Sequence, residues 1–170
     1  VASFSNASKD GYTFKGWYTE SSFTNKITGI TTTTTGNKNL YAKFTANSYT
    51  LTYDNQSGTG CTSKGGAYDS AWGDLCEPSR AGYTFGGWYT EASGKGTKIA
   101  KTTVCKGNLK VYAKWTANNY TLTYDNQGGN DCDKKTGSYG STWGDLCTPN
   151  REGYTFGGWY FDESCTASNS

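Results

Sequence analysis

The chain has 170 residues and a formal charge of +2, from 16 Lys and Arg against 14 Asp and Glu, and it contains no His. The scattered charges lack the basic stripe of a nucleic-acid-binding protein, and no apolar run approaches the roughly 18–20 residues of a membrane span. Without His, the usual Ser and Cys triads have no base. Aliphatic residues are scarce, so the 14 Tyr, 7 Phe and 6 Trp must supply most of any core.

The predicted elements are β-strands joined by tight turns, because 23 Gly and many Thr, Asn and Ser suit strands better than helices. The first is the aromatic segment Tyr12–Tyr18 (YTFKGWY), whose Gly predicts a bulge or close backbone approach. At most a turn or two of helix fits between Ser21 and Gly36. Alternating side chains predict strands at Leu40–Phe44 and Tyr49–Tyr53, and Asp54–Gly58 has the composition of a turn.

The remainder of the chain repeats this order. Segments reading Gly-Tyr-Thr-Phe begin at positions 11, 82 and 153, so the repeat period is 71 in both steps (82 − 11 and 153 − 82). A copied module buries its core within itself or against its neighbours, so copied residues are mostly folding residues. The repeat predicts strands at Tyr83–Tyr89, Val111–Trp115, Tyr120–Tyr124 and Tyr154–Tyr160, a turn at Asp125–Gly129, and at most a helical turn around Tyr68–Asp74.

Four of the six cysteines follow the same period. Cys61 and Cys132 are one period apart, and so are Cys76 and Cys147. Two cysteines copied together, at the same separation in each copy, predict one disulfide per repeat, Cys61–Cys76 and Cys132–Cys147. Such a disulfide is worth about 3 kcal/mol to a small domain, and it places the protein outside the reducing cytosol.

Cys105 and Cys165 do not follow the pattern, because their counterparts one period earlier are Thr34 and Gly94. They are candidates for a bridge between consecutive repeats or between chains. A zinc site is not expected, because no His is present and the cysteines lack short C-x2-C spacing.

These segments resemble the Listeria–Bacteroides repeat, the internalin-type B-repeat of bacterial surface proteins. The resemblance is carried by Tyr49–Gln56 (YTLTYDNQ) with its Gly turn, by Pro78 and Pro149 shortly before Gly-Tyr-Thr-Phe-x-Gly-Trp-Tyr, and by the closing Tyr-Ala-Lys-Phe/Trp. It implies a mainly β fold of tandem, small β-grasp-like (ubiquitin-like) modules on extracellular proteins. Such modules act as spacers, stalks or adhesive elements without known catalysis. The cysteines depart from the family's usual cysteine-poor pattern.

The family's boundaries divide the chain into three parts: 1–47 as the C-terminal part of a repeat, 48–118 as a complete repeat, and 119–170 as the N-terminal part of a further repeat. The lack of any Met, including at position 1, leads us to expect a mature product or a section of a longer protein. If the incomplete parts complete one another between molecules, the contact is heterologous and builds an open filament unless it closes into a ring.

Aromatic and polar residues offer further candidate sites. Trp72 and Trp143 lie in identical WGDLC segments, and an exposed indole there can stack on a sugar or a protein partner. The competing interpretation, which we favour, is packing over the adjacent disulfide and Leu. N-glycosylation motifs begin at Asn6, Asn55 and Asn119. An acidic loop beginning at Asp125 suits Ca²⁺ less well than it suits a solvated turn.

The sequence therefore predicts a non-catalytic, extracellular or cell-surface tandem-repeat protein with a structural, adhesive or filament-assembly role. No catalytic residue, metal or cofactor is expected. The expected partners are other repeats or copies of the same chain in head-to-tail assembly, and host or matrix glycoproteins. The alternative is a carbohydrate- or glycoprotein-binding module that uses exposed Trp and Tyr, and a further alternative is an accessory domain of an enzyme.

Overall fold

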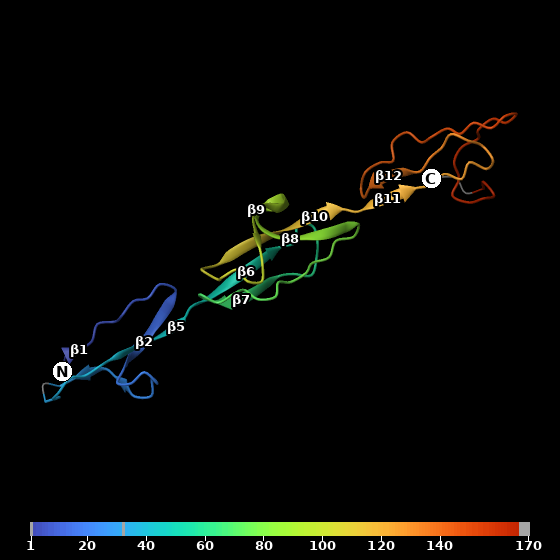
Figure 1. The fold of residues 1–170 in the computed structure, drawn as a ribbon. Helices are drawn as coiled ribbons and strands as arrows, with labels where there is room; N and C mark the ends of the chain where they lie inside the picture. Colours follow the sequence, from blue (N-terminus) through green and yellow to red (C-terminus); the bar gives the residue numbers. More distant parts are fainter. Residues whose placement is uncertain (1, 32, 167–170) are drawn as a thin grey trace. The chain divides into compact units, whose positions relative to one another are not determined.

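A computed structural model describes residues 2–31 and 33–166, and its regular secondary structure is mainly β-strand (Figure 1). The chain forms two compact units, unit 1 from Val1 to Thr116 and unit 2 from Ala117 to Ser170. The described residues contain no α-helix, and the 3-10 turn η1 (Ala92–Gly94) is their one helical element. No helix in this part of the chain has the length and apolar character to cross a membrane.

Unit 1 contains a five-stranded sheet with the order β7-β6-β10-β8-β9. Its first and last strands in sequence, β6 and β10, lie side by side and parallel, with Leu109 opposite Leu51 and Tyr112 opposite Asp54. β10 is therefore the central strand, with β6 on one side and β8 on the other. The bounds are β6 (Ser48–Asp54), β7 (Ser63–Ala67), β8 (Tyr83–Glu91), β9 (Lys95–Ile99) and β10 (Leu109–Ala117).

The alternation seen in the sequence places one face of this sheet in the core. Leu51 and Tyr53 of β6 are 0% and 6% exposed, and Val111 and Ala113 of β10 are 0% and 1% exposed. Trp88 of β8 is 1% exposed, and its ring centroid lies 4.6 Å from that of Tyr53. Aromatic residues thus supply much of the core volume, as the composition predicts.

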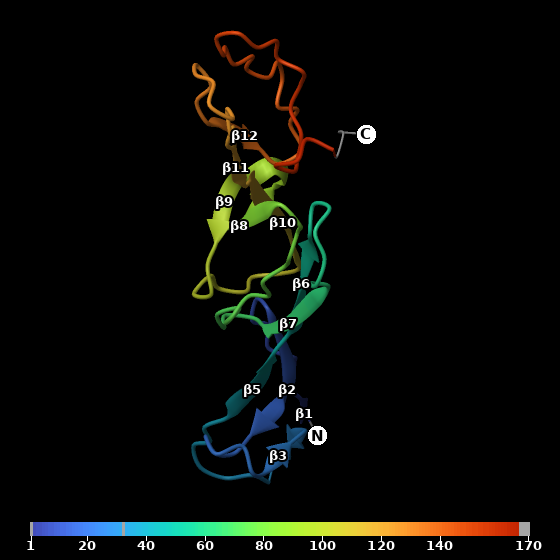
Figure 2. The same ribbon diagram turned by 90° about the vertical axis from the view of Figure 1, so that its right-hand side faces the viewer.

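Unit 1 also contains a smaller, three-stranded sheet with the order β3-β2-β5 (Figure 2). β2 (Tyr12–Tyr18) pairs antiparallel with β3 (Lys26–Ile27) and with β5 (Tyr41–Ala46). The register shifts between Phe14 and Gly16, where Gly16 has a φ of 130°. The expected bulge is therefore present. A short pair, β1 (Ala2–Ser3) with β4 (Gly29–Ile30), completes this region.

Unit 2 contains one antiparallel pair, β11 (Asn119–Leu122) with β12 (Lys135–Ser138). The strand predicted at Tyr120–Tyr124 ends two residues early, and the strand predicted at Tyr154–Tyr160 is absent. Both corrections have one reason. The matching segments of unit 1 pair with β10 or β5, whereas no described strand of unit 2 takes that place. An isolated edge without its ladder does not hold extended geometry.

Candidate functional site

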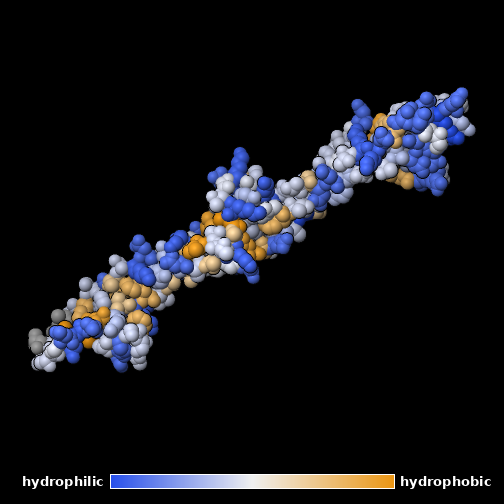
Figure 3. Space-filling model, viewed as in Figure 1, coloured by the Kyte–Doolittle hydropathy of each residue, from blue (hydrophilic) through white to orange (hydrophobic). Residues whose placement is uncertain are grey.

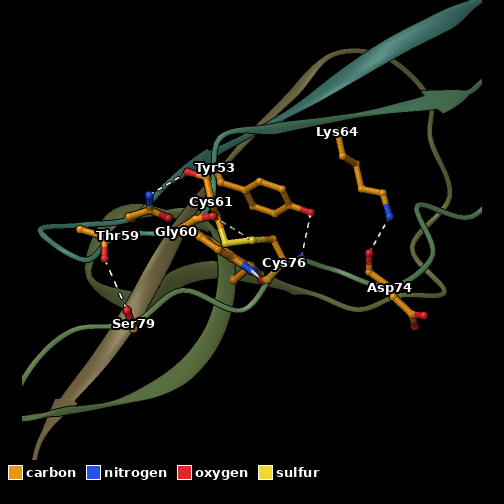
Figure 4. The surroundings of a disulfide bond; sticks show 10 residues. Tyr53, Thr59, Gly60, Cys61, Lys64, Asp74, Cys76 and Ser79 are labelled. Carbon is orange, nitrogen blue, oxygen red and sulfur yellow. Dashed lines mark hydrogen bonds between the residues drawn. A yellow bond between two sulfur atoms is a disulfide. The ribbon is translucent and has the colours of Figure 1, made fainter.

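Two disulfides fasten the loops that follow β6 and β11. The structure joins Cys61 to Cys76 and Cys132 to Cys147, the pairs that the repeat period predicts, with Cα–Cα distances of 5.8 and 5.7 Å. Figure 4 shows the Tyr53 ring beside the first disulfide. The Cys76 amide donates to the Tyr53 hydroxyl at 3.3 Å, which links the loop to the core strand.

A tryptophan indole donates a hydrogen bond to the second cysteine of each disulfide. Trp88 Nε1 donates to the carbonyl oxygen of Cys76 at 2.7 Å, and Trp159 Nε1 donates to that of Cys147 at 2.7 Å. The GWY tryptophan thus serves as both core residue and hydrogen-bond donor. The donor role has no signal in the strand pattern alone.

The two candidate stacking residues differ in exposure. Trp72 is 4% exposed, and its ring covers Gly66, where an added Cβ would lie 2.6 Å from the ring. Trp143 covers Gly137 in the same way but is only partly buried. The burial of Trp72 leaves no ring face for a sugar, which supports the packing interpretation at that position.

The two remaining cysteines have different surroundings. Cys105 is 0% exposed in the core of unit 1, and its backbone pairs with Ser70 and Asp69. Cys165 is exposed, and both thiols are free. Burial of Cys105 leaves its thiol inaccessible to another chain while unit 1 stays folded.

The three N-glycosylation motifs also differ. Asn6 and Asn119 are exposed, and Asn119 Oδ1 accepts a hydrogen bond from Ser138 at 2.7 Å. Asn55 Nδ2 donates to the carbonyl oxygen of Cys61 at 2.8 Å, inside the turn. A glycan needs that nitrogen, so folding and glycosylation compete at Asn55. Among the described residues no cluster of three or more His, Cys, Asp or Glu side chains is arranged for a metal.

Asn47 connects the three-stranded and five-stranded sheets of unit 1. Its amide donates to the carbonyl oxygen of Gly11 at 2.9 Å, and its carbonyl oxygen accepts from the Tyr68 amide at 2.9 Å. The Thr13 hydroxyl donates to Asn47 Oδ1 at 2.6 Å. Asn47 therefore hydrogen-bonds backbone groups that flank β2 of the three-stranded sheet and β7 of the five-stranded sheet. We call this set of contacts the Asn47 joint.

Rings and charges reinforce the Asn47 joint. The Tyr12 and Tyr68 rings meet edge to face at 5.6 Å, and the Lys106 ammonium is paired with the Asp69 carboxylate. The hydrogen bond from Lys106 lowers the pKa of Asp69, and the same pair raises the pKa of Lys106. The pKa of Tyr12 is raised by desolvation and by the nearby Asp69 charge. The Asp69–Lys106 pair has no signal in the repeat pattern, because Asp69 is Gly140 in the next copy.

Unit 2 contains an open groove of about 700 Å³ between β11 and the segment Tyr154–Phe161. Its lining includes Leu122, Tyr124, Trp143 and Trp159. The counterparts of these four residues in unit 1 are at most 6% exposed, whereas the unit 2 residues are only partly buried. Figure 3 shows hydrophobic residues at the surface of unit 2 among mostly hydrophilic ones.

The position of the groove follows from the repeat. Each of its walls lies one period after a strand that borders β10 in unit 1, β6 on one side and β8 on the other. The groove is therefore the place that the central strand occupies in the complete sheet. One ring contact of the complete repeat is also present in the groove lining. The Tyr124 and Trp159 ring centroids lie 4.6 Å apart, as those of Tyr53 and Trp88 do in unit 1.

A family model for the Listeria-Bacteroides repeat domain matches residues 1–43, 49–114 and 120–170. The chain belongs to the Listeria-Bacteroides repeat family. The three matched segments cover most of its length and include both walls of the groove.

Three relatives of the chain come from Evansella cellulosilytica and Listeria monocytogenes. The chain is 32% identical over 155 residues to a protein of Evansella cellulosilytica named as a membrane protein, covering 91% of this chain and 23% of the relative. A second protein of that organism, named as a Gly-rich membrane protein, is 29% identical over 158 residues, covering 93% of this chain and 18% of the relative. Internalin H of Listeria monocytogenes is 38% identical over 113 residues, covering 65% of this chain and 20% of the relative.

The chain spans less than a quarter of the length of each of these relatives. No solved structure matches the chain at a significant level.

Proposed function

We propose that this chain is a structural, non-catalytic repeat segment of a cell-envelope or cell-surface protein, which holds neighbouring modules in a fixed relation. The observation that carries the proposal is the Asn47 joint. It uses backbone hydrogen bonds on both sides of Asn47, so bending there breaks bonds that a flexible linker would not have. A segment of this kind can carry an adhesive or ligand-binding region at a set distance from a surface.

The sheet order supports a β-grasp-like module as the repeating element. In unit 1 the first and last strands of the complete repeat are parallel neighbours at the centre of a mixed sheet. In such a sheet the last strand of the repeat pairs with the first, so the strand pairing is complete within one module. One repeat period then corresponds to one module.

The relatives support the location. Two are named as membrane proteins and one as an internalin, and disulfide formation requires an oxidising compartment. A location outside the cytosol is consistent with both observations. Host or matrix glycoproteins are then partners of the whole protein, contacted through this segment or through regions that it carries.

The glycan-binding alternative loses its first candidate residue, because Trp72 is buried. Trp143 retains partial exposure, but it lines the groove whose walls match a strand position. The structural role therefore has the better physical basis.

The test is ¹⁵N relaxation of the folded chain, which reports rotational correlation times for residues 2–46 and 48–116. We expect one common correlation time for the wild type and two different ones for Asn47→Gly, because Gly removes the Thr13 contact and frees the backbone. Asn39→Gly, at an exposed loop position, serves as the control and should leave the common value unchanged. Two independent correlation times in the wild type would contradict a stiff spacer.

A further inference from the structure

The complete repeat begins and ends with two strands that pair with each other. The chain enters the repeat through β6 and leaves it through β10. These strands are parallel neighbours over four residue pairs, from Leu51 opposite Leu109 to Asp54 opposite Tyr112. A force transmitted along the chain therefore enters on one of these strands and leaves on the other, and their pairing is the direct link between them.

The parallel direction decides how such a force acts on the hydrogen bonds. In a parallel pair, the N-terminal end of one strand and the C-terminal end of the other lie at opposite ends of the ladder. Pulling on these two ends slides one strand along the other and strains all the hydrogen bonds of the ladder together. An antiparallel hairpin pulled at its two open ends behaves differently, because its hydrogen bonds break one after another.

A side-chain hydrogen bond lies just beyond each end of the β6–β10 ladder. Before the first pair, the Thr50 amide donates to Asn108 Oδ1 at 2.9 Å. After the last pair, Trp115 Nε1 donates to the carbonyl oxygen of Asn55 at 2.8 Å. Both bonds link the β6 side of the ladder to the β10 side, so they add to the backbone pairing between the strands.

The Trp115–Asn55 bond is oriented to resist sliding. Continuing the register of the ladder places Asn55 level with Ala113, two residues before Trp115. Tension pulls β6 toward its N-terminus and β10 toward its C-terminus. This motion increases the separation between Asn55 and Trp115 from the start, so the bond opposes it.

The ion pair across the same ladder slants the other way. Lys110 Nζ lies 2.9 Å from Asp54 Oδ2, but Lys110 stands opposite Thr52, two residues before Asp54. The sliding motion that separates Trp115 from Asn55 first brings Asp54 toward the level of Lys110. The ion pair therefore opposes the slide much less than the indole bond does.

Core packing prevents a partial slide from relieving the load. Leu51 of β6 and Val111 of β10 are both 0% exposed. A shift of one residue turns the side chains of a strand to the opposite face of the sheet, which would take Leu51 out of the core. β10 is also held by β8 on its other side. The ladder therefore has to break as a unit.

We propose that the complete repeat bears tension along the chain, and that it resists this tension through the β6–β10 ladder together with the Thr50–Asn108 and Trp115–Asn55 bonds. We call this element the β6–β10 clamp. The proposal deepens the structural role proposed above and rests on it for the source of the tension. It adds to the spacing role the ability to keep a constant length under load.

The experiment is to pull the full-length chain in optical tweezers, with DNA handles attached at Ser48→Cys and Thr116→Cys. Both positions are exposed. Every variant carries Cys165→Ser, which removes the exposed thiol, while the free thiol of Cys105 is buried and leaves the handles their intended sites. Rupture force is the appropriate measurement, because forced unfolding follows the unfolding rate and not the equilibrium stability.

The control changes only the pulling direction. Handles at Ser48→Cys and Ala67→Cys pull on two residues that face each other at the open end of the antiparallel β6–β7 ladder, which has five printed pairs from Ser48–Ala67 to Thr52–Ser63. We expect the 48–116 direction to rupture at about twice the force of the 48–67 direction or more, although its ladder is shorter. Equal forces, or a lower force in the 48–116 direction, would overturn the proposal.

The Cys61–Cys76 disulfide shows whether rupture of the clamp releases the repeat. Positions 48 and 116 lie on either side of this disulfide, which has a sequence separation of 15. After reduction, the extension on rupture should increase by about 50 Å, at up to 3.6 Å for each released residue. No increase would contradict the proposal, because the loop would then stay folded after the clamp has broken.

Trp115→Phe tests the end bond of the clamp. Phe is the residue of the preceding repeat at this position, Phe44, and it retains a ring beside Phe85, which lies 5.5 Å from Trp115. Loss of the indole donor should lower the rupture force in the 48–116 direction and leave the 48–67 direction unchanged. Lys110→Gln is the matched control and should change neither force.

Equal losses from Trp115→Phe in the two directions would show an effect on overall stability and overturn the role of Trp115 in the clamp. An equal loss from Lys110→Gln would overturn the argument from direction. The relaxation test concerns the Asn47 joint, whereas the handles at 48 and 116 load only the complete repeat. Either result can therefore fail while the other stands.

Discussion

The ring of Tyr68 lies directly against the backbone of Gly11, so close that a Cβ on Gly11 would clash with the ring. The two residues come from different repeats, with Gly11 just before β2 and Tyr68 just after β7. Gly11 also has a φ of 75°, which favours Gly over other residues. The first residue of the Gly-Tyr-Thr-Phe motif is therefore a joint residue, and not only a turn residue.

Gly11→Ala should destabilise unit 1 by roughly 2–4 kcal/mol, because backbone strain adds to the clash with Tyr68. Gly36→Ala is the control. It has a similar φ of 74° but no atom within 4 Å of an added Cβ, so strain alone should cost about 1 kcal/mol. Urea unfolding of both variants measures the difference. Equal losses would show that the Tyr68 contact has no energetic role.

The Asp69–Lys106 pair should make the Asn47 joint sensitive to acid. The folded pKa of Asp69 is lowered, so the pair stabilises the joint above the ordinary Asp pKa of about 3.9. This contribution is lost as the pH falls through the lowered pKa. The stability difference between wild type and Asp69→Asn should therefore vanish at acid pH. Urea unfolding across pH values checks this, with Asp74→Asn as the control, and a difference that persists in acid would contradict it.

Equivalent apolar residues should contribute unequally to the stability of the two units. Leu51 is 0% exposed, so Leu51→Ala should cost about 2–5 kcal/mol. Leu122, its counterpart, lines the open groove and is only partly buried, so Leu122→Ala should cost less than half as much. Thermal or urea unfolding followed by NMR signals of each unit measures both. Similar losses would mean that the groove is closed in solution.

Removal of the Cys61–Cys76 disulfide by paired Ala substitutions should cost about 3 kcal/mol, the entropy of closing a loop with a sequence separation of 15. The Cys132–Cys147 pair closes a loop of the same separation. Because unit 2 has fewer strand pairings to compensate, its structure should be lost first when both disulfides are reduced. Circular dichroism and NMR during reduction follow the order, and simultaneous loss would contradict it.

The sequence predicted the mainly β fold, because alternation in Tyr49–Tyr53 and Val111–Trp115 depends only on neighbouring residues. It also predicted the bulge at Gly16 and the two disulfide pairs from local geometry and spacing. It was wrong about Tyr154–Tyr160, which has the strand motif but no strand. A strand also depends on its partner, and the motif contains no information about whether that partner is adjacent.

The candidate sites likewise depend on neighbouring segments that a local motif does not specify. The sequence favours packing of both Trp72 and Trp143, and their identical WGDLC segments give no reason for a difference between them. The structure buries the Trp72 ring against Gly66 in unit 1 and leaves Trp143 partly exposed beside the groove. The Asn47 joint was missed because its residues come from four separated segments. A comparison of Asn47 with Asn118, one period later, would have marked it as a copied boundary residue.

The repeat motif becomes a strand only when a central strand lies beside it. Amide hydrogen exchange on the dilute chain tests this most directly, because Tyr83–Glu91 and Tyr154–Tyr160 are nearly the same sequence in the two situations. We predict slow exchange in Tyr83–Glu91, where the sheet is complete, and fast exchange in Tyr154–Tyr160. Equal protection of the two segments would contradict the claim.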